Sequence, residues 1–258
     1  MSVIKGTIDL AGRTVLVSGA ARGLGAAFAE ACGRAGARVI IADIRTDLAQ
    51  ETAQGLCGEG LDVASYAVDL ADPGSVEQLG ADIVRDYGCL DGLLNNAALA
   101  TGIGGKGLDE IDIETWDRVM TINVRGTWLM TKAFAPLLKA SSRGGRLVNL
   151  ASDTALWGAP NLLHYVSSKG AVMAMTRSLS RELGPFGVTV NAIAPGLVRV
   201  EATDYVPEER KQLYVDRAAI PRAQLPADVV GTAVFLLSDA SGFVSGQVIP
   251  VNGGFIAA

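Results

Sequence analysis

Short runs of β-branched and other apolar residues alternate with amphipathic segments along almost the whole sequence. Each run is bounded by Gly, Asp, Asn or Pro, and the runs lie in residues 13–19, 37–44, 62–70, 90–97, 145–152 and 187–196. Apolar residues recur with a helical period in residues 25–36, 47–58, 75–88, 115–138 and 165–183. Uninterrupted short apolar runs are typical of strands buried on both faces. Their alternation with helices predicts a doubly wound α/β domain, with a parallel sheet of about seven strands between two helical layers.

The pattern continues without an obvious linker. A chain of 258 residues can form one large domain or two small ones. Because no Ser/Pro-rich stretch and no repeat interrupts it, we expect one domain over residues 1–258. Residues 197–225 are more charged and contain several prolines. We interpret them as a flap over a site, with an ordinary surface insertion as the alternative.

Charge and hydropathy exclude several classes of function. The 22 basic and 27 acidic residues give a net charge of −5, and no long basic run offers a nucleic-acid surface. Residues 1–14 lack the apolar core of a signal peptide, and no apolar run approaches the roughly 18 residues of a membrane span. We therefore expect a soluble, cytoplasmic protein that binds neither nucleic acid nor membrane.

Cysteine and histidine are too few for several common chemistries. Cys32, Cys57 and Cys89 are scattered and show no C-x-x-C spacing, and His164 is the only histidine. This argues against a disulfide framework, a zinc site and a Ser-His-Asp triad. No metal site is expected.

A glycine-rich turn follows the first predicted strand. Gly19, Gly23 and Gly25 punctuate the sequence SGAARGLG, which leads directly into a helix. Glycine permits tight turns and close approach of a phosphate, and the start of a helix attracts anions. Alone, the pattern fits a purely structural turn equally well.

Asp43 ends the second predicted strand, about twenty residues after the turn. In dinucleotide-binding folds an acid there accepts hydrogen bonds from the adenosine ribose. Its charge would repel a 2′-phosphate, which favours NAD over NADP, although Arg22 and Arg45 are close enough in sequence to bind that phosphate. Asp43 could instead cap the next helix, but Thr46 and Asp47 are better placed to do so.

Tyr165 and Lys169 lie four residues apart at the start of an apolar helix, and therefore on one face of it. A phenol with a pKa of about 10 is a poor base at neutral pH. A nearby ammonium favours the phenolate, as would an oxidised nicotinamide. A shift of roughly 3 units requires about 4 kcal/mol of preferential stabilisation. The pair therefore predicts a general acid–base device.

Together these features resemble the short-chain dehydrogenase/reductase family, in its branch of about 250 residues, over nearly the whole chain. The resemblance implies a Rossmann fold and a catalytic set of Asn123, Ser152, Tyr165 and Lys169, with Ser152 and Tyr165 contacting substrate and Asn123 holding a water that passes protons from Lys169. It also implies a set of cofactor-binding residues. These are Gly19, Arg22, Gly23, Leu24, Gly25, Asp43, Asp69, Leu70, Asn96, Ala97, Tyr165, Lys169, Pro195 and Val198.

Single positions within this set have plainer interpretations. Asn123 could satisfy backbone groups at a helix kink, and Ser152 could simply end a strand. His164 points away from its neighbour Tyr165 on a helix, which favours a packing role.

The sequence also departs from the family pattern. Ala98 stands where Gly is usual, Val200 replaces a Thr that binds the carboxamide, and Asn252 replaces an Asp. Thr203 could substitute for the missing Thr. These changes concern cofactor geometry and leave the proton-transfer groups unchanged.

We expect an NAD-dependent enzyme that interconverts a hydroxyl, on a secondary or on an aryl or cyclic alcohol, and a carbonyl. Leu99, Leu156, Trp157 and Leu162 suggest an apolar substrate pocket, although Trp157 could belong to the core. The alternatives are an NADPH-dependent 3-oxoacyl carrier-protein reductase, which Asp43 disfavours, and a catalytically silent NAD-binding regulatory protein. A nucleotide-sugar epimerase should be longer, with differently spaced glycines.

Two long predicted helices, residues 115–138 and 165–183, carry apolar or small residues on more than one face. A helix on the outside of a monomer should keep a wider polar face. Members of the family commonly pair these helices between subunits. We therefore expect a homotetramer, with a dimer as the alternative.

Overall fold

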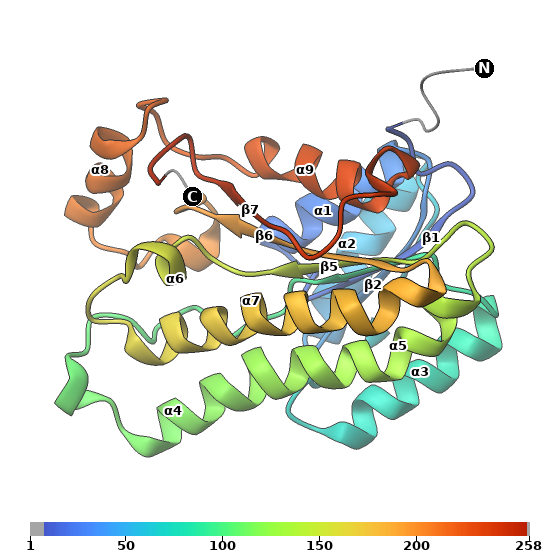
Figure 1. The fold of residues 1–258 in the computed structure, drawn as a ribbon, viewed down its shortest axis with the longest axis horizontal. Helices are drawn as coiled ribbons and strands as arrows, with labels where there is room; N and C mark the ends of the chain where they lie inside the picture. Colours follow the sequence, from blue (N-terminus) through green and yellow to red (C-terminus); the bar gives the residue numbers. More distant parts are fainter. Residues whose placement is uncertain (1–7, 257–258) are drawn as a thin grey trace.

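A computed structural model describes residues 8–256. The expected domain covers residues 1–258 and therefore extends beyond the described residues at both ends. Part of the segment expected to lack a signal peptide, residues 1–7, also lies outside the described residues. Within the described range the chain forms one seven-stranded sheet in which every neighbouring pair is parallel, in the order β3-β2-β1-β4-β5-β6-β7 (Figure 1). The predicted doubly wound Rossmann fold is confirmed. The strands are β1 (Thr14–Ser18), β2 (Arg38–Asp43), β3 (Val63–Ala67), β4 (Gly92–Asn95), β5 (Arg146–Leu150), β6 (Thr189–Pro195) and β7 (Val248–Val251).

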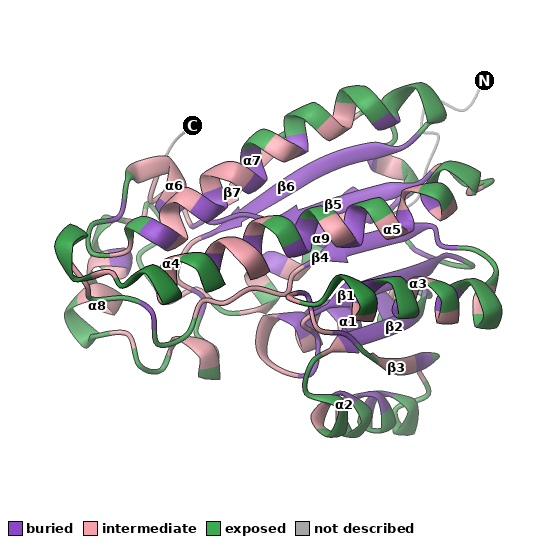
Figure 2. Cartoon of the chain, turned by 90° about the horizontal axis from the view of Figure 1, so that it is seen from below, coloured by how far each residue is buried: buried purple, intermediate pink, exposed green. Residues whose placement is uncertain are grey.

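Helices cover both faces of the sheet (Figure 1). Alternate residues of the central strands enter different apolar clusters: Val15 and Val17 pack against one helical layer, while Leu16 packs against the other. The central strands are accordingly buried along their whole length (Figure 2). The helices are α1 (Gly23–Arg34), α2 (Thr46–Gly58), α3 (Pro73–Tyr87), α4 (Ile113–Met120), α5 (Thr127–Ala140), α6 (Thr154–Trp157), α7 (Leu163–Leu183), α8 (Glu208–Arg217) and α9 (Ala227–Leu237).

The helix predicted over residues 115–138 is not continuous. A π-helical segment, η2 (Thr121–Gly126), lies between α4 and α5, with Asn123 buried inside it. Single π-turns inside α-helices often occur at functional sites, because the extra residue changes the direction of a side chain.

Strand order reverses between β1 and β4, so the loops after these two strands diverge. In open parallel sheets such a reversal leaves a crevice at the carboxyl ends of the strands. Residues 197–225 lie at this end of the sheet and contain η4 (Glu201–Thr203) and α8. Asn252 follows β7 at the same end.

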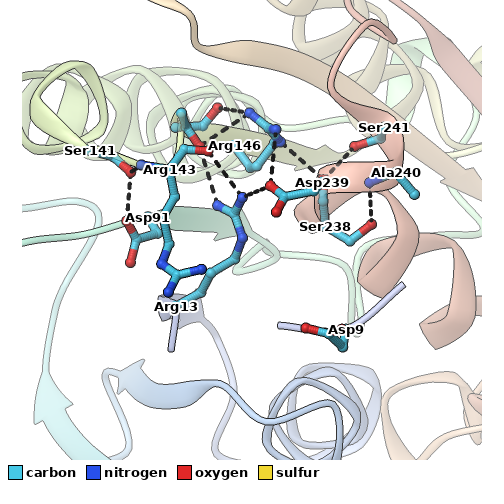
Figure 3. Close-up of polar contacts among 12 residues, drawn as sticks. Asp9, Arg13, Asp91, Ser141, Arg143, Arg146, Ser238, Asp239, Ala240 and Ser241 are labelled. Atoms are coloured by element: carbon cyan, nitrogen blue, oxygen red, sulfur yellow. Dashed lines mark hydrogen bonds and ion pairs between the residues drawn. The ribbon is translucent and has the colours of Figure 1, made fainter. Parts of the chain in front are cut away.

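The opposite end of the sheet is held by buried arginines (Figure 3). Arg13 and Arg146 are nearly inaccessible, at 2% and 5% exposure, and both form ion pairs with Asp239. Arg13 also donates to the carbonyls of Arg143 and Gly144. We call Arg13, Arg146 and Asp239 the basal clamp, because it joins β1, β5 and the segment after α9.

Among residues 8–256, no helix is both long enough and apolar enough to cross a membrane.

Candidate active site

A cavity of about 550 Å³ lies at the carboxyl ends of the strands. Most of its walls are the segments that follow β1, β2, β3, β4, β5 and β6, together with residues 200–203 from above. Every predicted cofactor residue borders it, as do Ser152, Tyr165 and Lys169. Of the predicted site residues only Asn123 lies behind the wall.

The glycine turn at the end of β1 is closely packed. A Cβ on Gly25 would lie 2.0 Å from the carbonyl oxygen of Gly19, so no larger residue fits. Asn96 supports the turn from the next loop, with its side-chain amide donating to the carbonyls of Ser18 and Gly19 at 3.0 and 2.8 Å. Asn96 therefore acts at least partly as a support, a role that its position in the sequence motif did not reveal.

The start of α1 can receive an anion. Gly23 has a φ of +58° and borders the cavity. The helix has neither a side-chain cap at Arg22 nor an acidic residue in its first turn, so its first N–H groups are available. These features fit the diphosphate of a dinucleotide.

Asp43 is held at the end of β2 by two backbone donors. Its carboxylate accepts hydrogen bonds from the N–H of Ala21 and the N–H of Arg45, each at 3.0 Å. The expectation that Thr46 and Asp47 cap the next helix is wrong, because α2 begins after Arg45 with no side-chain cap. The contact with Ala21 links Asp43 directly to the glycine turn.

Asp69 and Leu70 line the same half of the cavity, after β3. The Asp69 carboxylate accepts from the N–H of Ala71 at 2.8 Å, and its own N–H donates to Ser75. The side chain thus fixes the turn that presents Leu70 to the cavity.

Tyr165 and Lys169 lie together on the face of α7 that borders the cavity. The Lys169 Nζ atom lies 5.6 Å from the centre of the Tyr165 ring and donates to the carbonyl of Leu150 at 2.7 Å. Burial raises the pKa of Tyr165, and the nearby Ser152 hydroxyl only partly opposes this. Without cofactor the pKa of Tyr165 is therefore raised overall, opposite to the expected lowering, because desolvation of the phenolate dominates.

Lys169 is itself affected by burial, which lowers its pKa to about 8. An ammonium in this position readily exchanges a proton near neutral pH. Ser152 is the second residue after the end of β5, where its Oγ accepts from the Thr154 hydroxyl at 2.9 Å.

Asn123 bridges η2 to the loop after β4. Its side chain accepts from the N–H of Leu99 at 2.7 Å and donates to the carbonyl of Leu99 at 3.1 Å. It also donates to the hydroxyl of Ser168, which in turn donates to the carbonyl of Tyr165. These contacts agree with the interpretation that Asn123 forms hydrogen bonds with backbone groups at a helix irregularity. They also connect the loop at Leu99 to the turn of α7 that carries Tyr165.

The upper wall of the cavity is closed by hydrogen bonds that the sequence did not indicate. The Tyr205 hydroxyl donates to the carbonyl of Ala100 at 2.7 Å, and that of Thr101 donates to the carbonyl of Ala202 at 3.3 Å. Thr203 donates only to the carbonyls of Val198 and Val200, so its hydroxyl is engaged within its own loop. This does not favour Thr203 as a substitute for the Thr missing at position 200.

Only one of the four residues expected to make the pocket apolar borders it. Leu99 does, whereas Leu156, Trp157 and Leu162 do not. Trp157 packs instead against Tyr214 and Phe255, with ring centres 6.3 and 5.7 Å away. The apolar wall comes from Ala98, Ala100, Val200 and Ala202.

His164 is fully buried at the start of α7 and does not border the cavity. Within residues 8–256, no group of three or more His, Cys, Asp or Glu side chains could hold a metal ion.

The fold and this crevice define a class of protein, the dinucleotide-dependent oxidoreductases built on a doubly wound sheet. Comparison with known proteins narrows the class. The family model described as Enoyl-(Acyl carrier protein) reductase matches residues 19–256. Sorbitol dehydrogenase of Cereibacter sphaeroides is 37% identical, over 95% of this chain and 98% of its own length.

Two further relatives bear on the cofactor and substrate. The 3-oxoacyl-[acyl-carrier-protein] reductase FabG of Thermotoga maritima is 32% identical, over 96% of this chain and 99% of its own. The crystal structure of a putative NAD(P) dependent gluconate 5-dehydrogenase from Beutenbergia cavernae, with NADP bound, is 36% identical and superposes with a TM-score of 0.89, over 97% of this chain and 99% of that one. The chain belongs to the short-chain dehydrogenase/reductase family, and it is an oxidoreductase of alcohols and carbonyls.

Proposed function

We propose that the protein is an NAD-dependent dehydrogenase that interconverts a secondary alcohol and a ketone. The main support for this proposal is that one continuous cavity contains both halves of such a site. Ser152 and Tyr165 border it, as do the uncapped start of α1 and Asp43. The nicotinamide supplies the hydride acceptor when the cofactor is bound.

In this proposal each polar residue of the cavity has one task. The Ser152 hydroxyl orients the substrate oxygen, and the Tyr165 Oη takes the hydroxyl proton in oxidation or returns it in reduction. Lys169, with its pKa of about 8, receives or supplies that proton on the side away from substrate. Because burial raises the pKa of Tyr165, the phenol needs the positive charge of the oxidised cofactor to act as a base.

The decisive experiment is Tyr165→Phe. We expect kcat to fall by about a thousandfold, within the usual range for loss of a general acid–base group, with unchanged affinity for NAD. Stopped-flow turnover and isothermal titration with NAD measure the two quantities. Turnover within tenfold of the unaltered protein would contradict the role of Tyr165. Absence of any turnover by the unaltered protein would favour the silent NAD-binding alternative.

The choice of NAD rests on Asp43. A second negative charge at the ribose 2′ position would lie beside this fixed carboxylate, whose two backbone donors prevent it from turning away. We expect kcat/KM with NAD to exceed that with NADP by at least tenfold, and Asp43→Ser to reduce the ratio. A preference for NADP would instead support the 3-oxoacyl carrier-protein reductase alternative, with Arg22 and Arg45 binding the phosphate.

The apolar wall described above, together with Leu99, favours an alcohol with an apolar substituent, such as an aryl or cyclic group. The likeness to sorbitol dehydrogenase favours a sugar alcohol as the second candidate. Comparing kcat/KM for 1-phenylethanol, cyclohexanol and sorbitol distinguishes them. In both cases we assign residues 197–225 as the cover of the substrate end of a single domain.

Exposed apolar side chains on the outer helices support association. Ile113, Trp128 and Leu163 are exposed on α4, α5 and α7, and Phe243 is exposed before β7. We propose a homotetramer in the cytoplasm, with a dimer as the smaller alternative. Light scattering should give about four times the chain mass of 26.7 kDa. A single species at the chain mass would contradict association.

A further inference from the structure

A buried carboxyl group lies directly beside Ser152 and has no task in the proposed proton transfer. Asp153 is completely inaccessible, and its backbone N–H donates to the carbonyl of Pro195 at 3.0 Å. Its own carbonyl accepts the N–H groups of Leu156 and Trp157, so Asp153 also begins α6. A fully buried carboxyl group is costly unless it is hydrogen-bonded, so its partners indicate why it is there.

Those partners come from segments far apart in the chain. The Tyr214 hydroxyl, on α8, donates to one carboxyl oxygen of Asp153 at 3.1 Å. The side-chain amide of Asn252, just after β7, lies 3.4 Å from the other oxygen as a long hydrogen bond. Asp153 thus connects the Ser152 end of β5 to α8 and to the C-terminal segment.

An aromatic cluster shields this connection from water. The Tyr214 ring stacks on Phe255 at 4.5 Å and meets the edge of Trp157 at 6.3 Å. Arg210 lies over the Trp157 ring at 5.5 Å and donates to the carbonyl of Pro160. In such a dry environment a single hydrogen bond to a carboxyl group contributes more than it would at the surface.

A third segment faces the same carboxyl group. The space above Gly196 is bordered by a carboxyl oxygen of Asp153 and by the Oε1 atom of Gln224, which is buried and has no hydrogen-bond donor among the described residues. The amide nitrogen of Gln224 donates to the carbonyl of Val251 at 2.6 Å. Tyr214 from the middle of the 197–225 segment and Gln224 from its C-terminal end therefore both lie beside Asp153.

We propose that Asp153 is a positioning residue that holds the 197–225 cover closed over the cavity. The hydrogen bond from Tyr214 holds α8 against the end of β5 that carries Ser152. Helix α8 in turn holds residues 200–205, the part of the cover nearest the cavity, which we call the roof. Asp153 touches neither substrate nor cofactor in this role. Its effect on the reaction passes through the position of the roof.

Tyr214→Phe tests the proposal with little disturbance, because it removes the hydroxyl and keeps the aromatic stacking. We expect KM for the alcohol to rise about tenfold, the value of one hydrogen bond to a buried carboxyl group, with kcat within twofold. The matched control is Tyr66→Phe, since Tyr66 donates to Asp86 at 2.8 Å on a remote surface. Equal KM values for the two variants would overturn the proposal.

Limited trypsin digestion gives a readout independent of turnover. Arg210 and Lys211 on α8 are held in the closed cover, Lys211 by donation to the carbonyl of Asp204 at 3.1 Å. We expect both Tyr214→Phe and Asp153→Leu to speed cleavage of α8 about tenfold at temperatures where the core stays folded. Asp153→Asn keeps an acceptor for Tyr214 and should slow cleavage again relative to Asp153→Leu. Cleavage of Tyr214→Phe at the rate of Tyr66→Phe would also overturn the proposal.

The activity readout rests on the proposed function, whereas the digestion does not. If no alcohol is turned over, the proposed function fails, and faster cleavage of the variants still supports the role of Asp153. If turnover is normal in every variant and cleavage is unchanged, the role of Asp153 fails alone.

Discussion

Burial dominates the ionisation of the key side chains at the scale of single residues. It raises the pKa of Tyr165 and lowers that of Lys169, so both groups are pushed toward their neutral forms. The two effects favour proton exchange within the pair, while the charge needed to stabilise a phenolate must come from elsewhere.

A difference titration tests this statement. Ultraviolet absorbance of the protein minus that of Tyr165→Phe should show no phenol ionisation below pH 10 without cofactor. Saturating NAD should bring the ionisation to lower pH. A phenolate signal near neutral pH in the protein without cofactor would show that Lys169 alone acidifies Tyr165.

Asp153 predicts a pH effect on stability. Burial raises its pKa from 3.8 to about 6, with opposing contributions from Tyr214, Asn252 and Arg210. A raised pKa contributes stability below pH 4 that is lost as pH rises through about 6. Asp153→Asn has no charge to bury, so at pH 7 its free energy of unfolding should exceed that of the unaltered protein by up to about 3 kcal/mol.

Urea unfolding at pH 4 and pH 7 measures this difference. The advantage of Asp153→Asn should be much smaller at pH 4, where the native carboxyl group is protonated. A constant difference at both values would mean that the ionisation of Asp153 does not affect folding.

Several residues of the site were predictable from sequence and others were not. Asp43 ends a strand and Gly25 and Ser152 follow strands, and parallel strands bring their carboxyl ends together, so sequence order was enough to group them. The direction of Trp157 was not predictable, because it depends on Tyr214 and Phe255, which are distant in the sequence. The ionisation of Tyr165 was missed for a related reason, since burial depends on the whole surrounding fold.

At the scale of elements, the local irregularities carry function. The predicted helix over residues 115–138 is interrupted by η2, which turns Asn123 toward Leu99. The π-turn could not be predicted from the spacing of apolar residues, because the helical apolar pattern continues through it. The central strands, by contrast, were predictable, since both of their faces are apolar, whereas the half-buried edge strand β7 was not among the predicted runs.

The short η4 element predicts an effect on cofactor affinity. The Glu201 carboxylate lies 3.3 Å from where a Cβ on Gly23 would be, at the turn proposed to receive the diphosphate. No basic group within residues 8–256 lies within ion-pair distance of it. Because like charges repel, Glu201→Gln should lower the Kd for NAD by about three- to tenfold at low salt and less at high salt.

Isothermal titration at two salt concentrations checks this expectation. Glu209→Gln is the matched control, since it removes the same charge from the exposed face of α8. An equal Kd for the two variants would mean that Glu201 moves away at no cost when the cofactor binds.

At the scale of the whole molecule, the cavity and the basal clamp lie at opposite ends of the sheet. The cavity takes its walls from loops after the strands, while Arg13 and Arg146 precede or begin β1 and β5. Both arginines depend on Asp239, which is 49% exposed. Asp239→Asn leaves two buried cations without their shared anion and should lower the free energy of unfolding by about 2 kcal/mol.

Chemical unfolding measures this loss, and the exposed ion pair of Arg38 and Asp62 provides the control. Asp62→Asn should cost less than about 1 kcal/mol, as surface ion pairs usually do. KM for the alcohol and for NAD should be unchanged in Asp239→Asn. A loss no larger than that of Asp62→Asn would show that the carbonyls of Arg143 and Gly144 suffice for Arg13.

The distance between the basal clamp and the cavity has a practical consequence. Substitutions that raise thermal stability can be made around the basal clamp. Substitutions that change which alcohol is accepted belong in the loops at the carboxyl ends of the strands. Because the effects of distant substitutions on stability are usually additive, the two sets of substitutions can be selected separately and then combined in one protein.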